Sequence, residues 1–197
     1  MPGGRPRGFD EDAALEAAMN LFWQQGYEAT GVAELTRAMG ITPPSLYAFF
    51  GNKDEVFRRA VDRYVAGPAR HLADAFSQPT ARGVAEHLLR GMIALAAGDG
   101  TPPGCLTVNG ALTRSARNQK AYEDLAGRRQ AGERLLARRL EQADPGELPP
   151  GQSPQALARY LFALSYGFAV QAAGGAVAGE LHEAADAALS QWPAVRT

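Results

Sequence analysis

Residues 40–57 read GITPPSLYAFFGNKDEVF. Two adjacent prolines are followed by Ser-Leu-Tyr and then by two phenylalanines. Thr42 is a suitable N-cap, and Pro43 suits the first helical position because an N–H there would have no intrahelical partner. Leu46 and Phe50 are four residues apart and therefore share one face. The pattern predicts a short helix with a polar start and an apolar inner face.

The segment before this helix has a helical pattern as well. Apolar residues at helical spacing predict a first helix over about residues 10–25, closed by Gly26, and a short second helix over about 31–39. A tight turn, Met39-Gly40-Ile41, leads from there into the helix that Thr42 caps. Two short helices joined in this way indicate a helix-turn-helix, whose second helix enters the major groove of DNA.

The rest of the chain continues the helical pattern, and it lacks the alternation typical of strands. A helix over about 53–76 is interrupted at Gly67-Pro68, where we expect a kink or a break. Further helices are expected over about 79–97, 104–117, 118–142, 153–173 and 180–191. We therefore predict an all-α protein of about nine helices, with a DNA-binding domain over residues 1–57 and a second helical domain over 58–197.

Composition narrows the class of protein. The chain has 197 residues, of which 46% are hydrophobic and 21% charged, and its net charge is −1. One cysteine excludes an internal disulfide and suits a reducing compartment, so we expect a cytoplasmic protein. Residues 160–179 carry no charge, but Gln171 and the Gly174-Gly175 pair favour a buried helix over a membrane span. We expect no membrane partner.

No motif in the sequence indicates catalysis. The three histidines, His71, His87 and His182, lie far apart, and one cysteine cannot build a thiolate metal site. Neither a nucleophile-elbow motif nor a phosphate-binding loop is present. We therefore predict that the protein is not an enzyme and that it has no catalytic residue, no metal site and no cofactor.

The first quarter of the chain resembles the DNA-binding domain of the TetR family of bacterial transcriptional regulators. The resemblance spans about residues 9–57 and depends on the order and spacing of several residues together. These are Phe22, Gly26-Tyr27, Thr30, Leu35, Ala38-Met39-Gly40-Ile41-Thr42, Ser45-Leu46-Tyr47, Phe50, Lys53 and Phe57. It implies an all-helical regulator that binds a palindromic double-stranded operator as a homodimer, most simply as a repressor.

The resemblance also implies which residues contact DNA. Tyr47 and Lys53 would contact phosphates, and Thr30 and Gly31 would contact the backbone at the start of the second helix. The residues in or beside the groove would be Thr42, Pro43, Pro44, Ser45 and Phe49. Arg5 and Arg7, in the basic first residues, would enter an adjacent minor groove, unless this terminus is simply solvated.

Three positions depart from the family pattern, and the charge balance is unusual. Gly31 stands where Ser or Thr is frequent, Pro44 where glycine is frequent, and Phe49 where histidine or tyrosine is frequent. Residues 1–50 hold three basic and six acidic groups, which is unlike the basic surface of most DNA-binding domains. The operator sequence therefore does not follow from the resemblance.

The second domain is expected to bind a small-molecule inducer and to dimerise, as the resemblance implies. Ligand sites in helix bundles are built from side chains on facing helices. Candidate pocket residues are Leu88, Met92, Leu95, Cys105, Val108, Leu112, Tyr122, Phe162 and Tyr166. The charge-poor helix over 153–173 and the last helix are expected to form the dimer interface.

Two alternatives stay open at the level of the sequence. In the first, Cys105 senses oxidants or electrophiles, because a helix N-terminus favours thiolate; the opposing interpretation is an inert buried cysteine. In the second, the chain is a helical protein-binding module with vestigial DNA binding, which the acidic balance of residues 1–50 favours. No motif in the sequence identifies the inducer, the operator or the regulated genes. No motif decides between repression and activation either.

Overall fold

The computed structural model describes residues 10–144 and 146–193, and within them every regular element is a helix. The prediction of an all-α protein is thereby confirmed. The helices are α1 (Glu11–Ala29), α2 (Val32–Ala38), α3 (Pro43–Phe50), α4 (Lys53–Ala66), α5 (His71–Phe76), α6 (Ala81–Ala97), α7 (Leu106–Asn109), α8 (Gln119–Glu141), α9 (Pro154–Ala173) and α10 (Ala178–Leu189).

Several helices begin where a short polar side chain accepts a backbone hydrogen bond. Asp10 caps α1, Thr42 caps α3, Asn52 caps α4, Thr80 caps α6 and Ser153 caps α9. Each cap satisfies an N–H group that has no partner inside its helix. Local sequence therefore sets these helix starts, which explains why they were predictable.

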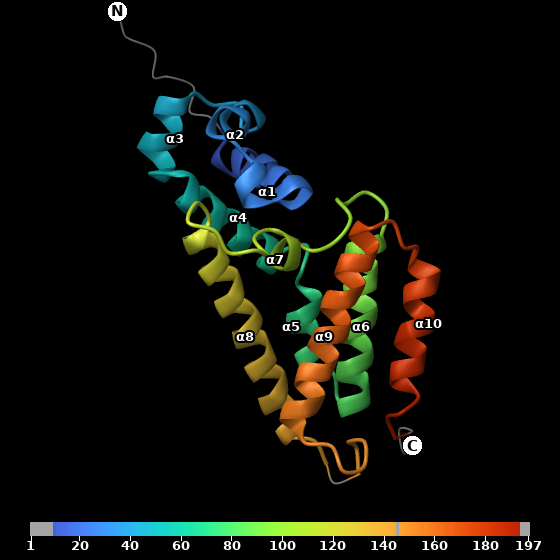
Figure 1. Ribbon diagram of the computed structural model, residues 1–197. Helices are drawn as coiled ribbons and strands as arrows, with labels where there is room; N and C mark the ends of the chain where they lie inside the picture. Colours follow the sequence, from blue (N-terminus) through green and yellow to red (C-terminus); the bar gives the residue numbers. More distant parts are fainter. Residues whose placement is uncertain (1–9, 145, 194–197) are drawn as a thin grey trace, which may run out of the picture.

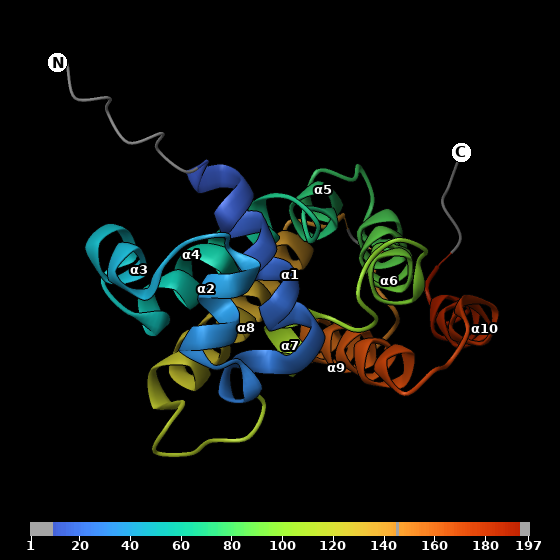
Figure 2. The same ribbon diagram turned by 90° about the horizontal axis from the view of Figure 1, so that it is seen from above.

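The helices form two groups that share α4. Helices α1 to α3 pack at one end of the molecule, and α6, α8, α9 and α10 lie lengthwise in the other part (Figure 1). Helix α6 contacts α5, α9 and α10, whereas α8 contacts α9 and α4. Seen from above, α3 and α10 lie at opposite edges of the molecule (Figure 2).

Helix α4 belongs to both groups, so the expected boundary at residue 57 falls inside a helix. Phe57 makes edge contacts with Phe22 and Tyr27 of α1, with ring centroids 5.0 and 5.1 Å apart. Further along α4, Tyr64 packs against Trp23, with ring centroids 4.7 Å apart. On its other side α4 contacts α8, where Arg128 pairs with Asp62 of α4 at 2.7 Å. A movement of α4 would therefore change contacts in both groups.

Two glycines shape the chain as the sequence indicated. Gly26 has φ 78° and ψ 174°, which interrupts the helical conformation of α1 three residues before its end. Gly67 ends α4, and a turn over residues 67–70 separates it from α5. The predicted helix over 53–76 is therefore two helices, and the described residues form ten helices where about nine were expected.

The helix expected over 104–117 is wrong in length, because α7 spans only Leu106–Asn109. Side chains satisfy the backbone of the following segment. Asn118 accepts a hydrogen bond from the Ser115 N–H at 2.8 Å and donates to the Thr113 carbonyl at 2.8 Å. Such side-chain bonds offer the backbone an alternative to the helical ladder.

The described residues contain neither a helix suited to a membrane nor a cluster suited to a metal ion. Across residues 10–144 and 146–193, no helix has the length and apolar character needed to cross a bilayer. The same residues contain no group of three or more His, Cys, Asp or Glu side chains placed to hold a metal ion.

Candidate nucleic-acid interface and ligand cavity

Helix α3 has one buried and one exposed apolar face. Leu46 and Phe50 are buried in the core, whereas Tyr47 and Phe49 are 54% and 56% exposed. Apolar side chains that are exposed next to one another, unlike singly exposed ones, often mark an interaction site. The outer face of α3 is therefore a candidate contact surface, and it projects away from the rest of the molecule (Figure 1).

The start of α3 offers side chains to a partner, because few backbone N–H groups are free there. Pro43 and Pro44 have no N–H, and the Ser45 N–H is bound by the Thr42 hydroxyl at 3.3 Å. The hydroxyls of Thr42 and Ser45 also share a hydrogen bond of 2.9 Å. Thr42, Pro43 and Pro44 are exposed and Ser45 is half-buried, so a partner would meet hydroxyls and proline rings.

Lys53 does not extend into solvent in this structure. Its ammonium lies 4.0 Å from the centroid of the Tyr27 ring, a cation–π contact. Burial lowers the pKa of Lys53, while Asp54 and Glu28 act in the opposite direction. The Tyr27 hydroxyl donates to Asp54, whose carboxylate also pairs with Lys120 of α8 at 3.3 Å. A phosphate contact would require Lys53 to leave this site.

The remaining predicted contacts differ in accessibility. Thr30 is fully buried, and its hydroxyl donates to the Gly26 carbonyl at 2.7 Å. Gly31 is the exposed N-cap of α2, with no atom near the position of a β-carbon. Arg5 and Arg7 lie outside the described residues. No observation here tests the DNA contacts, which stay predictions.

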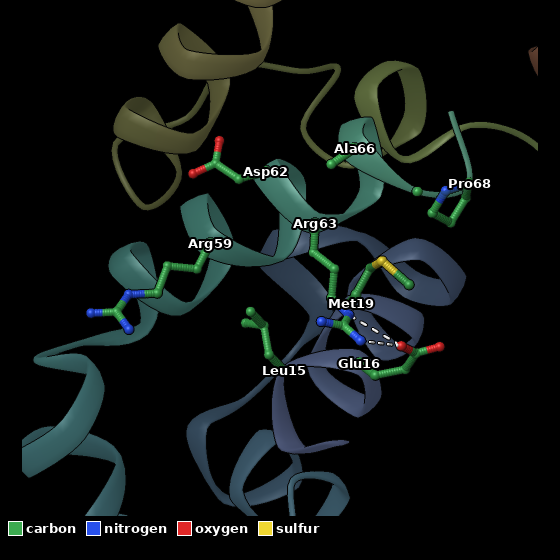
Figure 3. Close-up of a pocket in the computed structure, with 9 residues that line it drawn as sticks. Leu15, Glu16, Met19, Arg59, Asp62, Arg63, Ala66 and Pro68 are labelled. Carbon is green, nitrogen blue, oxygen red and sulfur yellow. Dashed lines mark hydrogen bonds and ion pairs between the residues drawn. The ribbon is translucent and has the colours of Figure 1, made fainter. Parts of the chain in front are cut away.

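The acidic side chains of α1 are neutralised by α4. Arg63 pairs with Glu16 at 2.7 Å and with Asp12 at 3.1 Å, and Arg59 pairs with Glu11 at 3.1 Å. Figure 3 shows the Arg63 guanidinium against Glu16 in a surface hollow of about 630 Å³ between the two helices. The acidic count of residues 1–50 therefore overstates the negative charge available to repel DNA. The hollow itself is open and its charged groups are already paired.

A second cavity, of about 250 Å³, lies in the larger helical group and is mostly apolar. Helices α4, α5, α6, α8 and α9 contribute to its walls. So do Cys105, just before α7, and Thr107 within it. The lining residues are Val65, Ala69, His71, Leu72, Leu88, Met92, Cys105, Thr107, Arg128, Arg129, Ala131, Gly132, Leu135, Phe162, Ser165 and Tyr166. Leu88, Met92, Cys105, Phe162 and Tyr166 were among the candidate pocket residues.

The other candidates lie away from this cavity. Leu95 and Val108 are buried elsewhere in the core, Tyr122 is half-buried and Leu112 is 57% exposed. None of these four lines the cavity. All nine pocket assignments stay predictions.

The cavity contains polar groups that sequence reasoning missed. His71 Nδ1 and Ser165 Oγ are buried and have no hydrogen-bond partner among residues 10–144 and 146–193. Burial, with a smaller contribution from His87, lowers the pKa of His71 to about 4, so this imidazole is neutral near pH 7. The only sequence signal was a polar residue on an otherwise apolar helix face, as Ser165 is on α9.

Cys105 lies on the wall of the cavity and is 1% exposed. Its sulfur accepts a hydrogen bond from the Tyr64 hydroxyl at 3.2 Å and contacts the Thr107 hydroxyl at 3.1 Å. Next to it, the Gly104 carbonyl accepts a hydrogen bond of 3.1 Å from the Trp23 indole. The cavity wall is thus bonded to α1.

A second hydrogen bond joins the same segment to α1. The Gly110 carbonyl accepts a bond of 2.8 Å from the Tyr27 N–H. On the cavity side, Arg129 of α8 donates to the Thr107 carbonyl at 2.6 Å. Residues 104–110 therefore connect the cavity with the helix on which the helix-turn-helix is built.

Known proteins resemble both the sequence and the fold. The family profile described as bacterial regulatory proteins of the tetR family matches residues 14–60. The HTH-type transcriptional repressor ComR of Escherichia coli strain K12 is 38% identical over 195 residues, which are 96% of this chain and 92% of that protein. The repressor BdcR of the same strain is 51% identical over 71 residues, 36% of each chain.

Solved structures agree with these relatives. A cysteine mutant of the TetR family regulator CifR, complexed with 26-bp double-strand operator DNA, superposes with a TM-score of 0.89 at 36% identity. That match covers 96% of this chain and all of the other. The reduced form of Escherichia coli NemR, at 23% identity and a TM-score of 0.77, shares the fold over 93% of this chain and 98% of its own. The chain belongs to the TetR family of bacterial transcriptional regulators.

Proposed function

We propose that this protein is a transcriptional repressor that binds double-stranded operator DNA as a homodimer and releases it when a small molecule occupies the cavity. The observation that carries the proposal is the pair of exposed aromatic residues, Tyr47 and Phe49, on a capped helix whose other face is fully buried. A helix of this kind fits the major groove, where its first turn meets base edges.

The relatives support the DNA partner. ComR and BdcR are named as HTH-type transcriptional repressors, and the CifR structures were solved with operator DNA. Tyr47 offers a hydroxyl to a phosphate, and Phe49 offers an apolar contact to a thymine methyl group or to the sugar backbone. Phosphate contacts would set the register of α3, and its first turn would read the sequence.

The homodimer is supported by the outer face of α9. Tyr160, Ala163, Gly167 and Val170 recur every three or four residues and all are exposed or half-exposed. Such an apolar stripe on a helix indicates an interface. The contribution expected from α10 is smaller, because its apolar residues Leu181, Ala185, Ala188 and Leu189 are buried inside the protomer, where α10 packs on α6.

Residues 104–110 offer a route from the cavity to DNA. They are bonded to Arg129 on one side and to Trp23 and Tyr27 on the other. A ligand that binds one arrangement of these bonds more tightly than the other would shift the population of the DNA-binding state. DNA is then released when the distance between the two α3 helices of a dimer no longer matches the distance between successive major grooves.

The test is a selection of fragments of the source genome on the purified protein at near-physiological salt. We expect enrichment of one palindromic sequence, with loss of enrichment for Tyr47→Ala and Lys53→Ala proteins. Binding that is insensitive to salt would contradict phosphate contacts, since these release counterions. Failure of a folded dimer to enrich any sequence would favour the protein-binding module.

A second candidate function rests on the position of Cys105. Its sulfur lines the cavity, so a small electrophile that entered it would meet the thiol. Addition of the sulfur to the electrophile, with loss of the thiol proton to water, would break the bond from Tyr64 and disturb residues 104–110. A Cys105→Ser protein should then keep its operator affinity after electrophile treatment. Release of DNA from the treated serine variant would refute this function.

A further inference from the structure

We propose that the cavity selects a small organic carboxylate with an apolar body, held through Arg129, Ser165 and Tyr166. This inference rests on the proposed function, in which the cavity is the effector site. It adds the chemical class of the effector, which neither the family nor any named relative supplies. Three features of the cavity carry it.

The first feature is size. An apolar cavity of about 150 Å³ is large enough for benzene, and drug-sized ligands occupy roughly 300–1,000 Å³. The volume of this cavity is about 250 Å³, which lies between the volume that holds benzene and the volumes that hold drug-sized ligands. A molecule of about ten non-hydrogen atoms therefore fits by volume, by comparison with benzene. Leu72, Leu88, Met92 and Phe162 provide apolar walls for most of its surface.

The second feature is an arginine without a counterion. Two arginines line the cavity. Arg128 is bound by Asp124 at 2.8 Å and by Asp62 at 2.7 Å, so its charge is satisfied. Arg129 is half-buried, and across the described part of the chain its guanidinium donates only to the Thr107 carbonyl. A guanidinium has five N–H donors in a fixed fork that suits a carboxylate.

The charge of the cavity follows from the rest of its lining. No aspartate or glutamate is among the described residues that line it. His71 does not add a positive charge near neutral pH, because burial lowers its pKa to about 4. Glu133, the carboxylate that acts on Tyr166, is paired with Arg159 at 3.1 Å. The lining thus carries one half-buried cation that has no paired carboxylate among the described residues. A partly buried charge without a partner carries a desolvation cost, and a bound anion would reduce that cost.

The third feature is a set of neutral polar groups in the same cavity. Ser165 is fully buried, and its hydroxyl has no partner in the described residues. Tyr166 is half-buried, and burial raises the pKa of its hydroxyl, so this hydroxyl is a neutral donor. Arg129 lies close enough to Tyr166 to oppose that rise. Unpartnered buried groups such as the Ser165 hydroxyl are rare in proteins and suit a ligand.

The predicted binding mode follows from these groups. One carboxylate oxygen would accept from the Arg129 guanidinium, and the other would accept from a hydroxyl of Ser165 or Tyr166. Val65 and Leu135, both partly exposed, lie on the lining and mark the side from which a ligand enters. Because Arg129 also holds the Thr107 carbonyl, a carboxylate competes for the donor that fixes residues 104–110.

The test uses three probes that share a phenylalkyl body and differ in the charge of the polar end. They are 3-phenylpropanoate, 3-phenylpropanamide and 3-phenylpropylamine. Binding to the full-length protein is measured by calorimetry, and release of a selected operator duplex is measured by fluorescence anisotropy. We expect the carboxylate to bind at least about 10-fold more tightly than the amide, because hydrogen bonds to an ionised group are stronger. The amine should not bind.

Variants identify the group responsible. Arg129→Gln should lose about 10-fold or more of the affinity for the carboxylate and change the affinity for the amide less than threefold, and Arg129→Lys should recover part of the loss. The matched control is Arg134→Gln, the same change at an exposed position of α8 outside the cavity. It should leave all affinities unchanged.

The outcomes separate the inference from the proposed function. Equal affinity for the carboxylate and the amide, or no binding of any probe at millimolar concentration, would overturn the inference. An amide that releases DNA at the same concentration as the carboxylate would overturn it while leaving the effector cavity in place. A carboxylate that binds through Arg129 without releasing DNA would support the inference and refute the effector role of the cavity.

Discussion

A Tyr47→Phe substitution should weaken operator binding about 100-fold and leave the fold intact. The change removes one oxygen from the outer face of α3. Tyr47 is 54% exposed, and its hydroxyl has no hydrogen-bond partner among residues 10–144 and 146–193. Surface changes of this kind alter the free energy of unfolding by no more than about 0.5 kcal/mol.

The magnitude follows from the contact that the hydroxyl is expected to make. A hydrogen bond to a charged acceptor such as a phosphate oxygen contributes about 1.5 kcal/mol at the lower end of its range. A dimer makes the contact twice, once in each half-site, which gives about 3 kcal/mol. Each 1.4 kcal/mol is about a factor of ten in affinity, so a loss of about 100-fold is expected.

The assay is fluorescence anisotropy with a selected operator duplex, paired with urea denaturation of each protein. Tyr122→Phe, the same change at a half-buried tyrosine of α8 that does not line the cavity, is the control and should bind as the unmodified protein does. The salt dependence should not change, since the phenol carries no charge to release counterions. Unchanged affinity of the Tyr47→Phe protein would refute the phosphate contact, and a parallel loss of stability would show that folding is the cause.

Three further changes test the local structure by urea denaturation. Thr42→Ala removes the cap of α3 and should lower the free energy of unfolding by about 1 kcal/mol. Gly26→Ala places a residue with a β-carbon at φ 78°, ψ 174°, and should lower the free energy of unfolding by about 1–3 kcal/mol. Its control is Gly127→Ala at an exposed position of α8, which should instead raise the free energy of unfolding by about 0.5–1 kcal/mol. The pKa of His71 is lowered to about 4 in the folded state, so the unfolded state binds more protons below its ordinary pKa of about 6.5. Between pH 7.5 and pH 5, the free energy of unfolding should therefore fall by about 2 kcal/mol more in the unmodified protein than in His71→Gln. Equal pH profiles for these two proteins would contradict this expectation. An unchanged Thr42→Ala protein or a stabilised Gly26→Ala protein would contradict the other two.

The sequence was sufficient wherever local chemistry decides the structure. Thr42 as a cap, Pro43 at the first helical position and the buried pair Leu46 and Phe50 are all as the spacing predicted. These features depend on neighbours within four residues, so one stretch of chain contains the necessary information. Gly26 is a similar case, because its positive φ is a backbone requirement that a single residue type reveals.

Contacts between distant segments could not be predicted. The helix expected over 104–117 is mostly absent because Asn118 binds the backbone of Ser115 and Thr113. Lys53 folds over Tyr27, which is 26 positions earlier in the chain, although its helix position suggested an exposed cation. Each outcome depends on which segments meet in space.

The cavity shows the same limit. Leu88 and Leu95 lie on the same apolar helix, but Leu88 lines the cavity and Leu95 does not. The polar groups that give the cavity its character, Arg129 and Ser165, were not among the residues predicted to line it. Only the packing of α8 and α9 against α4 to α6 brings them into one space.

The most direct test of the central claim is cleavage of DNA from a probe on α3. Ala48 is exposed on α3, and the native Cys105 is buried, so an Ala48→Cys protein can be labelled with an iron chelate at the new thiol. On a selected operator, we expect two regions of strand cleavage, about one helical turn or a multiple of it apart, related by the symmetry of the palindrome. The same label at Arg134→Cys on α8 should give none. Cleavage from α8 but not from α3, or a single region without symmetry, would contradict the account.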